Sequence, residues 1–412
     1  MPEKYKKTVA ACCLGYVTQS AVVNLAPLFF VIFRRDLGFS YSFIAALVFM
    51  TFAVQITVDA LSVRFMSRIG YRRCAILSQI ISAVGIALLG VLPGLIGNKG
   101  AAVMIAVIVY SVGGGLIEVV ISPIIDALPK RSKGGGMAFL HSFYSWGQVA
   151  VILLTTLSLR LFGESAWYTI AVVWAALPVF NTFMFAKVPI IEPVPQSAGS
   201  AVGRLFRSGT FILVLLLMIC AGAAEQVMAQ WASLFCEKGL GVEKVVGDIL
   251  GPCLFAAFMG IGRTFYGVRG EKIRLSNALI FCSSLAVVCY LLTVFSPSPL
   301  VSLAGCALCG LGVSLLWPGM LSLSSETFPA GGGAMFALLA LGGDIGCSLG
   351  PYLTGVVSDE VLSSGSITDL SSKYGMAPDE IGLKCGILAG IVFPLAMLAG
   401  TVAFALIGKK RE

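Results

Sequence analysis

The sequence predicts an all-α membrane protein whose twelve transmembrane helices form two six-helix halves related by pseudo-two-fold symmetry. Three observations lead to this fold class. Hydrophobic residues make up 58% of the 412 residues and charged residues only 12%, whereas about a quarter of an average globular sequence is charged. Apolar runs long enough to cross a bilayer fill the chain from end to end. An internal repeat relates the two halves.

The apolar runs are separated by segments that are charged or rich in proline and glycine. We predict spans over residues 8–33, 41–64, 74–97, 101–128, 136–160, 165–187, 209–236, 245–268, 275–295, 300–326, 332–357 and 385–408. The first run is too long for a cleavable signal and lacks a small-residue processing site. It is therefore expected to remain as the first helix.

The longest interior loop is rich in proline, glycine and serine and follows the sixth span. It predicts an N-terminal bundle over residues 1–187, a linker over 188–208 and a C-terminal bundle over 209–412. A shift of 197 residues superposes three landmarks of the first half on the second. They are Gly70 and Arg72 on Gly267 and Arg269, Gly113 and Gly115 on Gly310 and Gly312, and residues 134–136 on 331–333. Parallel six-helix repeats are typical of transporters that bind substrate between their halves.

The distribution of basic residues predicts the orientation in the membrane. The termini and the even-numbered loops, together with the ends of the spans that adjoin them, hold 20 of the 28 lysines and arginines. Because cytoplasmic loops carry an excess of lysine and arginine, both termini are expected to be cytoplasmic. We therefore expect a multi-pass protein of the plasma (inner) membrane. The net charge of +8 indicates membrane orientation rather than binding of nucleic acid.

The sequence offers no constellation for a cofactor, a metal or catalysis. The twelve cysteines fall almost entirely in apolar runs, and the CxxC pair Cys306 and Cys309 has no partner pair or nearby histidine, so we interpret them as packing residues. There is no glycine-rich phosphate loop and no nucleophile–base pair. The chain is therefore predicted not to be an enzyme or an ATP-driven pump.

Residues 113–147 contain the residues that are most unexpected in a membrane span. Glu118 lies in the middle of the fourth span, and His141, the only histidine, begins the fifth. Glu118 shares a helical stripe with Gly115, Ser122 and Asp126, and His141 shares one with Tyr144, Ser145 and Gln148. Intramembrane acids are functional by default. The alternatives are an acid that only bonds a neighbouring helix and a histidine that only fills the core.

Similar polar stripes lie on other spans. The first span carries Tyr16, Gln19, Ser20 and Asn24; the seventh carries Glu225, Gln226, Gln230 and Trp231; the tenth carries Gly310, Ser314 and Trp317; and the eleventh carries Asp344 and Ser348. Gln19, Asn24, Gln226, Gln230, Trp231 and Trp317 are candidate substrate-binding residues, together with His141, Tyr144 and Gln148. The alternative for the tryptophans is interface anchoring or packing between the halves.

Three carboxylates, Glu118, Glu225 and Asp344, are predicted to lie deep in the membrane. No lysine or arginine is predicted at the same depth, and Arg263 is expected nearer the cytoplasmic end as a structural partner. Burial disfavours the ionised form of a carboxyl group, so three ionised and unpaired acids are implausible. We therefore predict that they couple transport to protons, with sodium as the alternative.

The turn after the second span, residues 63–73, reads VRFMSRIGYRR. It resembles the GxLxDRxGRR motif of major facilitator transporters, with Arg68, Gly70, Arg72 and Arg73 matching and Val63 and Ser67 departing. In that family the arginine and aspartate latch neighbouring helices. The resemblance implies a gating latch of Arg68 and Arg72, with Arg269 as the repeat counterpart and Asp59 in place of the missing acid. Alternatively, Asp59 only caps its helix.

Spans four and five resemble the fucose:proton symporter-like branch of this superfamily. In that branch span four reads approximately GxxExxxNPxxxxLGP, which matches Gly115, Glu118, Pro123 and Leu128, with Ser122 replacing the asparagine. Residues 140–147, LHSFYSWG, resemble the branch's LAQTFNSFG. The resemblance implies that Glu118 is a protonation residue and places His141 at a sugar-binding position. The branch also uses an aspartate in span one, where Asn24 is the nearest candidate here.

The resemblance implies a proton-coupled secondary active transporter with alternating access for a small polar solute, a sugar or sugar derivative. The expected partners are this small-molecule substrate, a proton or sodium ion, and the lipid bilayer, and we expect a monomer. Because Glu225 and Asp344 depart from the branch, a cationic or amine-bearing substrate is an alternative. Two different functions also fit this fold: a proton-driven exporter of amphipathic or cationic compounds, and a nutrient receptor that does not transport.

Overall fold

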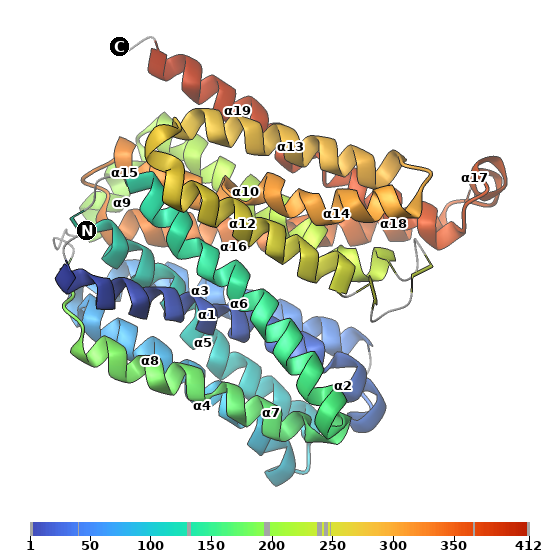
Figure 1. Cartoon of the computed structure of the whole chain (residues 1–412), viewed down its shortest axis with the longest axis horizontal. Coiled ribbons are helices and arrows are strands. Elements are labelled where there is room, and N and C mark those ends of the chain that lie inside the picture. The colour runs from blue at the N-terminus through green and yellow to red at the C-terminus, as the bar shows by residue number, and fades with distance from the viewer. Residues whose placement is uncertain are drawn as a thin grey trace. The chain divides into compact units, whose positions relative to one another are not determined.

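The computed structural model describes residues 3–39, 41–129, 133–192, 198–236, 241–242, 246–247, 249–365 and 367–409. Within these residues the regular structure is helical (Figure 1). Eleven helices are long and apolar enough to cross a membrane, and a shorter apolar segment, Ala46–Ser62, lies within the helix α3. These twelve segments coincide with the twelve predicted spans, and the predicted fold class is confirmed.

The helices of the first half begin close to the predicted boundaries. They are η1 (Glu3–Tyr5), α1 (Lys6–Leu28), α2 (Phe30–Leu37), α3 (Tyr41–Ile69), α4 (Tyr71–Leu95), α5 (Lys99–Asp126), α6 (Lys133–Phe162), η2 (Glu164–Ala166), α7 (Trp167–Trp174), α8 (Ala176–Lys187) and α9 (Ala198–Phe206). The helix α9 lies inside the segment predicted to be a linker.

The second half follows the same pattern. Its helices are α10 (Gly209–Leu234), η4 (Ile249–Cys253), α12 (Leu254–Arg269), η5 (Gly270–Lys272), α13 (Leu275–Phe295), α14 (Pro299–Val313), α15 (Leu316–Thr327), α16 (Gly332–Ser363), α17 (Ile367–Tyr374), α18 (Pro378–Ala389) and α19 (Val392–Lys409). The chain divides into two compact units, one formed by Met1–Ser208 with Ser324–Leu341 and the other by Gly209–Leu323 with Gly342–Glu412.

Prolines explain why three predicted spans are each built from two helices. A proline lacks the N–H that would bond the carbonyl four residues earlier, and its ring clashes with that carbonyl. The prolines are Pro178, Pro318 and Pro394, and the carbonyls four residues earlier are those of Trp174, Ser314 and Gly390. These positions coincide with the breaks between α7 and α8, between α14 and α15, and between α18 and α19.

Close helix packing in the first unit depends on glycine. The helix α4 packs against α5, α7 and α8 (Figure 1). A Cβ atom on Gly85 of α4 would lie 2.2 Å from the backbone nitrogen of Tyr110 on α5. A Cβ atom on Gly113 of α5 would lie 2.2 Å from Ser82 Oγ of α4. The two backbones therefore approach so closely that no side chain fits at either position.

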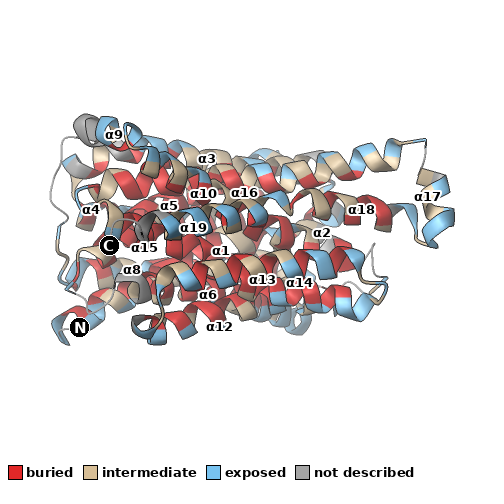
Figure 2. Cartoon of the chain, turned by 90° about the horizontal axis from the view of Figure 1, so that it is seen from above, coloured by how far each residue is buried: buried red, intermediate tan, exposed pale blue. Residues whose placement is uncertain are grey.

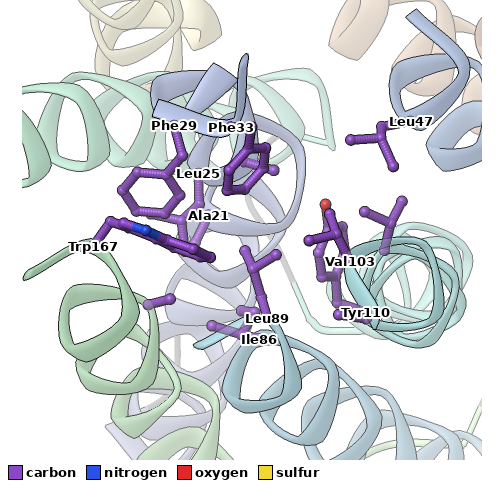
Figure 3. Close-up of a cluster of buried hydrophobic side chains, with 14 of the residues drawn as sticks. Ala21, Leu25, Phe29, Phe33, Leu47, Ile86, Leu89, Val103, Tyr110 and Trp167 are labelled. Carbon is purple, nitrogen blue, oxygen red and sulfur yellow. The ribbon is translucent and has the colours of Figure 1, made fainter. Parts of the chain in front are cut away.

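An aromatic cluster holds the short helix α2 against the body of the first unit. The Phe33 and Trp167 ring centroids are 5.0 Å apart in an edge-to-face arrangement, and those of Phe29 and Trp167 are 5.6 Å apart (Figure 3). Leu25, Ile86 and further aliphatic side chains complete this buried cluster. Edge-to-face aromatic pairs are favourable beyond the area that they bury, so the cluster fixes the break between α1 and α2.

Ion pairs connect the loops at the same end of the first unit. Arg35, near the end of α2, donates to the side chains of Asp36 and of Glu164, the first residue of η2. The hydrogen bond from the Arg35 guanidinium lowers the pKa of the Asp36 carboxyl group below its usual value. These groups are exposed, so salt weakens the contact.

The second unit repeats the use of glycine with exchanged partner helices. A Cβ atom on Gly310 would lie 2.0 Å from the carbonyl oxygen of Phe255 on α12, and one on Gly312 would lie 2.6 Å from the nitrogen of Ala286 on α13. In the first unit Gly113 approaches α4, the counterpart of α13, and Gly115 approaches α3, the counterpart of α12. The 197-residue repeat therefore superposes the helices of the two halves, but the equivalent glycines contact helices that are not equivalent.

The helices outside the predicted spans differ in burial from the membrane helices. The described side chains of α17 are exposed or half-buried, as Figure 2 shows. In contrast, more than half of the most apolar window is buried in α1, α5 and α10. The helix α17 is therefore a surface helix between the eleventh and twelfth spans.

Candidate functional site

Two side-chain hydrogen bonds join α1 to α5 in the middle of the first unit. Gln19 Nε2 donates to Glu118 Oε2 at 3.4 Å. One turn earlier on α1, the Tyr16 hydroxyl lies 3.1 Å from Ser122 Oγ. Residues three or four apart lie on one face of a helix, so the pair on α1 faces the pair on α5. The two helices run antiparallel here, since the higher number on α1 meets the lower number on α5.

The single histidine joins this pair of contacts from α6. His141 Nε2 lies 3.1 Å from the Tyr16 hydroxyl, and the two ring centroids are 4.5 Å apart. Tyr16 and His141 are 2% and 3% exposed, and Ser122 is 2% exposed. Three helices thus meet at the Tyr16 hydroxyl, which is shielded from solvent.

Glycines allow these three helices to approach each other. A Cβ atom on Gly114 of α5 would lie 2.8 Å from Gln19 Oε1, and one on Gly147 of α6 would lie 3.0 Å from Ser20 Cβ on α1. A larger residue at either position would push α1 away. The distance between Gln19 and Glu118 therefore depends on small residues that carry no polar side chain.

The remaining predicted binding residues of the first unit lie on the same helices. Gln148 is buried on α6, Tyr144 is half-buried one turn from His141, and Asn24 is half-buried on α1. Asn24 Nδ2 donates to the backbone carbonyl of Ser20 within its own helix. The structure therefore holds two sets of contacts one turn apart: Gln19 with Glu118, and Tyr16 with both Ser122 and His141.

In the second unit a buried ion pair links α10 to α12. Arg263 Nη2 donates to Glu225 Oε2 at 2.8 Å, and the two side chains are 2% and 9% exposed. The expectation that no basic residue lies at the depth of Glu225 is therefore wrong. Arg263 reaches Glu225 because a long side chain on a neighbouring helix can span more than a turn.

The same guanidinium serves the break in the tenth span. Arg263 Nε donates to the backbone carbonyl of Ser314 at 2.9 Å. This is the carbonyl that Pro318 leaves without its helical donor. A Cβ atom on Gly262 would lie 2.4 Å from Ser314 Oγ, so glycine permits the close approach of α12. Arg263 thus satisfies a backbone group that the interrupted helix exposes.

In another part of the second unit, the Trp317 ring packs against α16 at Gly343, the residue before Asp344. A Cβ atom on Gly343, the residue before Asp344, would lie 2.1 Å from the Trp317 ring. Asp344 is 2% exposed, and its Oδ2 atom has no hydrogen-bond partner among the described residues. A buried charged oxygen without a partner is costly, so Asp344 is the deep acid that most needs a proton or a cation.

The other predicted binding residues of this unit make local contacts. Gln230 Nε2 donates to Gln226 Oε1 at 3.3 Å on the same face of α10. Trp231 Nε1 donates to the backbone carbonyl of Pro351 on α16 at 3.2 Å. The Trp231 contact supports the alternative that this tryptophan packs helices together.

The predicted latch residue Arg72 connects α4 to α8. Arg72 Nη1 donates to the carbonyls of Phe185 and Ala186 at 3.0 and 3.1 Å, near the C-terminal end of α8. Glu192, which follows α8, accepts from the backbone N–H groups of Tyr71 and Arg72 at 2.8 and 3.3 Å. The negatively charged Glu192 therefore binds the N–H groups at the start of α4, and the positively charged Arg72 binds the carbonyls at the end of α8, so each charge is opposite in sign to the helix dipole at that end.

The Glu192 contact supports a stability prediction. Gly70, at the N-cap position of α4, has φ of 89° and makes no side-chain cap, so Glu192 takes the role of the cap. Glu192→Ala should cost about 1 kcal/mol of stability, typical of a lost N-cap. Glu192→Gln retains an acceptor and should cost less. Thermal unfolding of the purified variants in detergent measures both, and equal losses would contradict the contribution of a neutral acceptor to the cap.

The other latch candidates occupy different environments. Asp59 is fully buried on α3 and its backbone carbonyl accepts from Ser62 Oγ. Arg68 is exposed, and the guanidinium of Arg269, also exposed, lies over the Phe265 ring at 5.8 Å. Their roles in gating remain predictions.

Two residues of this site were not among the sequence candidates. Tyr16 lies on the polar stripe of the first span, three residues before Gln19, but its position between two partners was not foreseen. Arg263 was expected to be a structural partner for an acid or a helix end, but the sequence did not specify Glu225. The available signals were the three-residue spacing for Tyr16 and, for Arg263, the rarity of arginine in an apolar run.

Comparison of the sequence with models of protein families identifies the family of this chain. The sequence model of the Major Facilitator Superfamily matches residues 12–351. The chain belongs to the major facilitator superfamily. The match covers most of the chain and confirms the family that the motifs predict. Membership identifies a membrane transporter in a family that does not consist of enzymes. Among curated protein sequences, none matches this chain significantly.

Solved structures of major facilitator transporters share the fold. The fucose:proton symporter from Escherichia coli superposes with a TM-score of 0.72 at 14% identity, covering 96% of this chain and 99% of the symporter. A proton:xylose symporter gives 0.71 at 15% identity, covering 95% and 94%. The human organic anion transporter TETRAN gives 0.67 at 16% identity, covering 96% and 100%. At these identities the similarity shows the shared fold.

Proposed function

We propose that this major facilitator transporter is a proton-coupled secondary active transporter for a small polar solute, a sugar or sugar derivative. The observation that carries the proposal is the contact between Gln19 and Glu118 in the first unit. Glu118 is a half-buried acid in a membrane span that accepts from the neutral amide of Gln19. A hydrogen bond to a neutral donor is weaker than one to a cation, so this acid can exchange its proton as its surroundings change.

The character of the solute follows from the groups beside Glu118. The faces of α1 and α6 present hydroxyl, amide and imidazole groups, which both donate and accept hydrogen bonds. A polyhydroxylated solute offers many donors and acceptors in return. We assign Gln19, His141 and Gln148 to its recognition in the first unit, and Gln226 and Trp317 to its recognition in the second. The fold similarity to two sugar:proton symporters supports this assignment.

Asp344 favours a second candidate function, the export of cationic or amphipathic compounds. The Asp344 Oδ2 atom is buried without a partner among the described residues, and the Trp317 ring packs at the preceding residue, Gly343, so this part of the unit holds a negative charge and an aromatic ring. Organic cations bind to such a combination. Glu225 fits a coupling role less well, because Arg263 balances its charge.

Glu118→Gln tests the proposal in proteoliposomes. Glutamine keeps the shape and the hydrogen-bonding capacity of the side chain but cannot exchange a proton. The variant should lose accumulation driven by a pH gradient, by more than about tenfold if proton exchange is obligatory, while counterflow of the solute persists. Asp126→Asn on the same helix is the matched control.

The readouts separate the candidate functions. Labelled hexoses and amino sugars report uptake, and a fluorescent organic cation reports efflux. Undiminished uphill transport by Glu118→Gln would refute the role of Glu118, whereas efflux of the cation that depends on Asp344 would favour the exporter. We further propose that the protein is a monomer of the inner membrane. Both termini are proposed to lie in the cytoplasm, as the distribution of basic residues predicts.

A further inference from the structure

The Tyr16 hydroxyl occupies a position that only one hydrogen-bonding pattern at a time can satisfy. It lies 3.1 Å from Ser122 Oγ and 3.1 Å from His141 Nε2. A phenol hydroxyl has one proton to donate, so it can donate to only one of these two atoms. The atom that carries the proton on the histidine therefore decides the direction of both hydrogen bonds.

We propose that Tyr16 is a positioning residue that transmits the protonation of His141 to Ser122 by reversing its hydrogen bonds. When Nε2 is unprotonated, Tyr16 donates to His141 and accepts from Ser122. When the imidazole is charged, Nε2–H donates to Tyr16, and the single Tyr16 proton is then directed to Ser122. The proton itself stays on the histidine.

The change reaches the helix that carries Glu118. When the Ser122 hydroxyl accepts from Tyr16, it no longer donates to Tyr16. It can then donate to the backbone carbonyl four residues earlier, which is that of Glu118. Such bonds from serine to a preceding carbonyl bend helices. Pro123, the next residue in α5, already weakens the helix here. The reversal thus acts on α5 at the turn between Glu118 and Ser122.

The surroundings of the three residues make this switch discrete. Tyr16, Ser122 and His141 are each at most 3% exposed, so bulk water does not replace a lost partner. The contact between the Tyr16 and His141 rings, with centroids 4.5 Å apart, keeps the two side chains together in both states. In a low-dielectric interior an unmade hydrogen bond is costly, so both bonds reverse together.

Other titratable groups lie on the helices that contact this part of the unit. On α6 and the elements packed against it they are Lys6, Lys7, Cys12 and Cys13 on α1; Lys99, Tyr110, Glu118 and Asp126 on α5; Lys133, Tyr144 and Arg160 on α6; and Glu164 and Tyr168 on η2 and α7. The buried Asp59 lies on α3, which packs against α5. Of these, Asp126 accepts from Ser325 Oγ at 2.7 Å, and Arg160 and Glu164 belong to the far end of α6. The Tyr16 hydroxyl lies within hydrogen-bond distance of Nε2.

The presence of a single histidine allows a direct test. The full-length protein is labelled with nitrogen-15 histidine, placed in lipid nanodiscs and titrated by nuclear magnetic resonance, so that every imidazole signal belongs to His141. We expect one neutral tautomer above the titration midpoint, with Nε2 unprotonated. We expect both nitrogens to be protonated below it. A wild-type protein with Nε2 protonated over the whole folded pH range would overturn the proposal.

Two variants test the role of the hydroxyl. Tyr16→Phe removes the hydroxyl and keeps the ring contact. Without the hydroxyl, the two neutral tautomers of His141 should interchange, so the chemical shifts of its two ring nitrogens should approach each other. Ser122→Ala removes the serine hydroxyl that competes for the Tyr16 proton, and it should shift the titration midpoint while preserving the tautomer. Asn24→Ala on α1 is the control and should change neither signal. An unchanged tautomer pattern in Tyr16→Phe would also overturn the proposal.

The significance of the switch for coupling rests on the proposed function, but the resonance test does not. If Glu118→Gln retains uphill uptake while the His141 signals behave as expected, the proposed function fails and the switch stands. If Glu118→Gln loses uptake while Tyr16→Phe leaves the His141 signals unchanged, the switch fails alone. In transport, Tyr16→Phe should flatten the pH dependence of KM, whereas a residue needed only for packing would change the amount of folded protein.

Discussion

Replacing Arg263 with glutamine should destabilise the second unit by about 3–5 kcal/mol, because it leaves the buried Glu225 carboxylate without its cation. Arg263 Nη2 and Glu225 Oε2 are 2.8 Å apart, with 2% and 9% of the side chains exposed. The substitution also removes the donor to the Ser314 carbonyl, an acceptor that the interrupted tenth span cannot satisfy within the helix. Both losses leave a buried polar group unpaired.

A double-mutant cycle separates the two contributions. In Glu225→Gln/Arg263→Gln the charges are removed together, so most of the stability lost in Arg263→Gln should return. The part that does not return reports the other contacts of Arg263, among them the bond to Ser314. Arg263→Lys keeps the charge without the planar guanidinium, so its stability should lie between that of the wild type and that of Arg263→Gln. Heating the variants in detergent and measuring the folded fraction by size-exclusion chromatography gives the stabilities. A double variant less stable than Arg263→Gln would contradict the assignment.

Replacing Gly85 with alanine should destabilise the first unit by about 3 kcal/mol or more, at the upper end of the cost of overpacking. The added Cβ atom would lie 2.2 Å from the Tyr110 nitrogen and 2.6 Å from its Cα atom. Because these are backbone atoms of α5, relief requires the two helices to separate. Tyr110 also belongs to the aromatic cluster (Figure 3), so the shift would spread into the core.

Gly94 on the same helix is the matched control. A Cβ atom there would meet nothing within 4 Å, so Gly94→Ala should be neutral or stabilise by up to about 1 kcal/mol through helix propensity. The comparison is a thermal unfolding experiment on the two variants in parallel. Similar stabilities of Gly85→Ala and Gly94→Ala would show that α4 and α5 do not pack as closely as described.

Much of the fold could be predicted from the sequence because the membrane limits the possible structures. Only helices can satisfy their own backbone groups in lipid across a single segment, so the apolar runs determine where they lie. The breaks within three spans agree with Pro178, Pro318 and Pro394, which lie four residues after the carbonyls that lose their donors, although Pro93, Pro123 and Pro351 lie inside continuous helices. The spacing likewise placed Glu118 and Ser122 on one face of α5.

The partners in the candidate site could not be predicted in the same way. The spacing of Gln19 and Glu118 gives the face of each helix, but the contact between them depends on the rotation and depth of α1 against α5. That approach is permitted by Gly114, a residue without a functional group. Arg263 illustrates the same limit, because its side chain crosses to another helix and pairs with Glu225.

The sequence by itself determined the helical membrane fold, its two-fold repeat and the placement of an acid and a histidine in adjoining spans. Apolar length, proline positions and helical periodicity are local properties, and a single sequence contains them. Only the tertiary structure decided that Tyr16 connects Ser122 to His141, that Arg263 neutralises Glu225 and that Glu192 caps α4. Each of these contacts depends on the distance between helices, which close-packed glycines and long side chains set together.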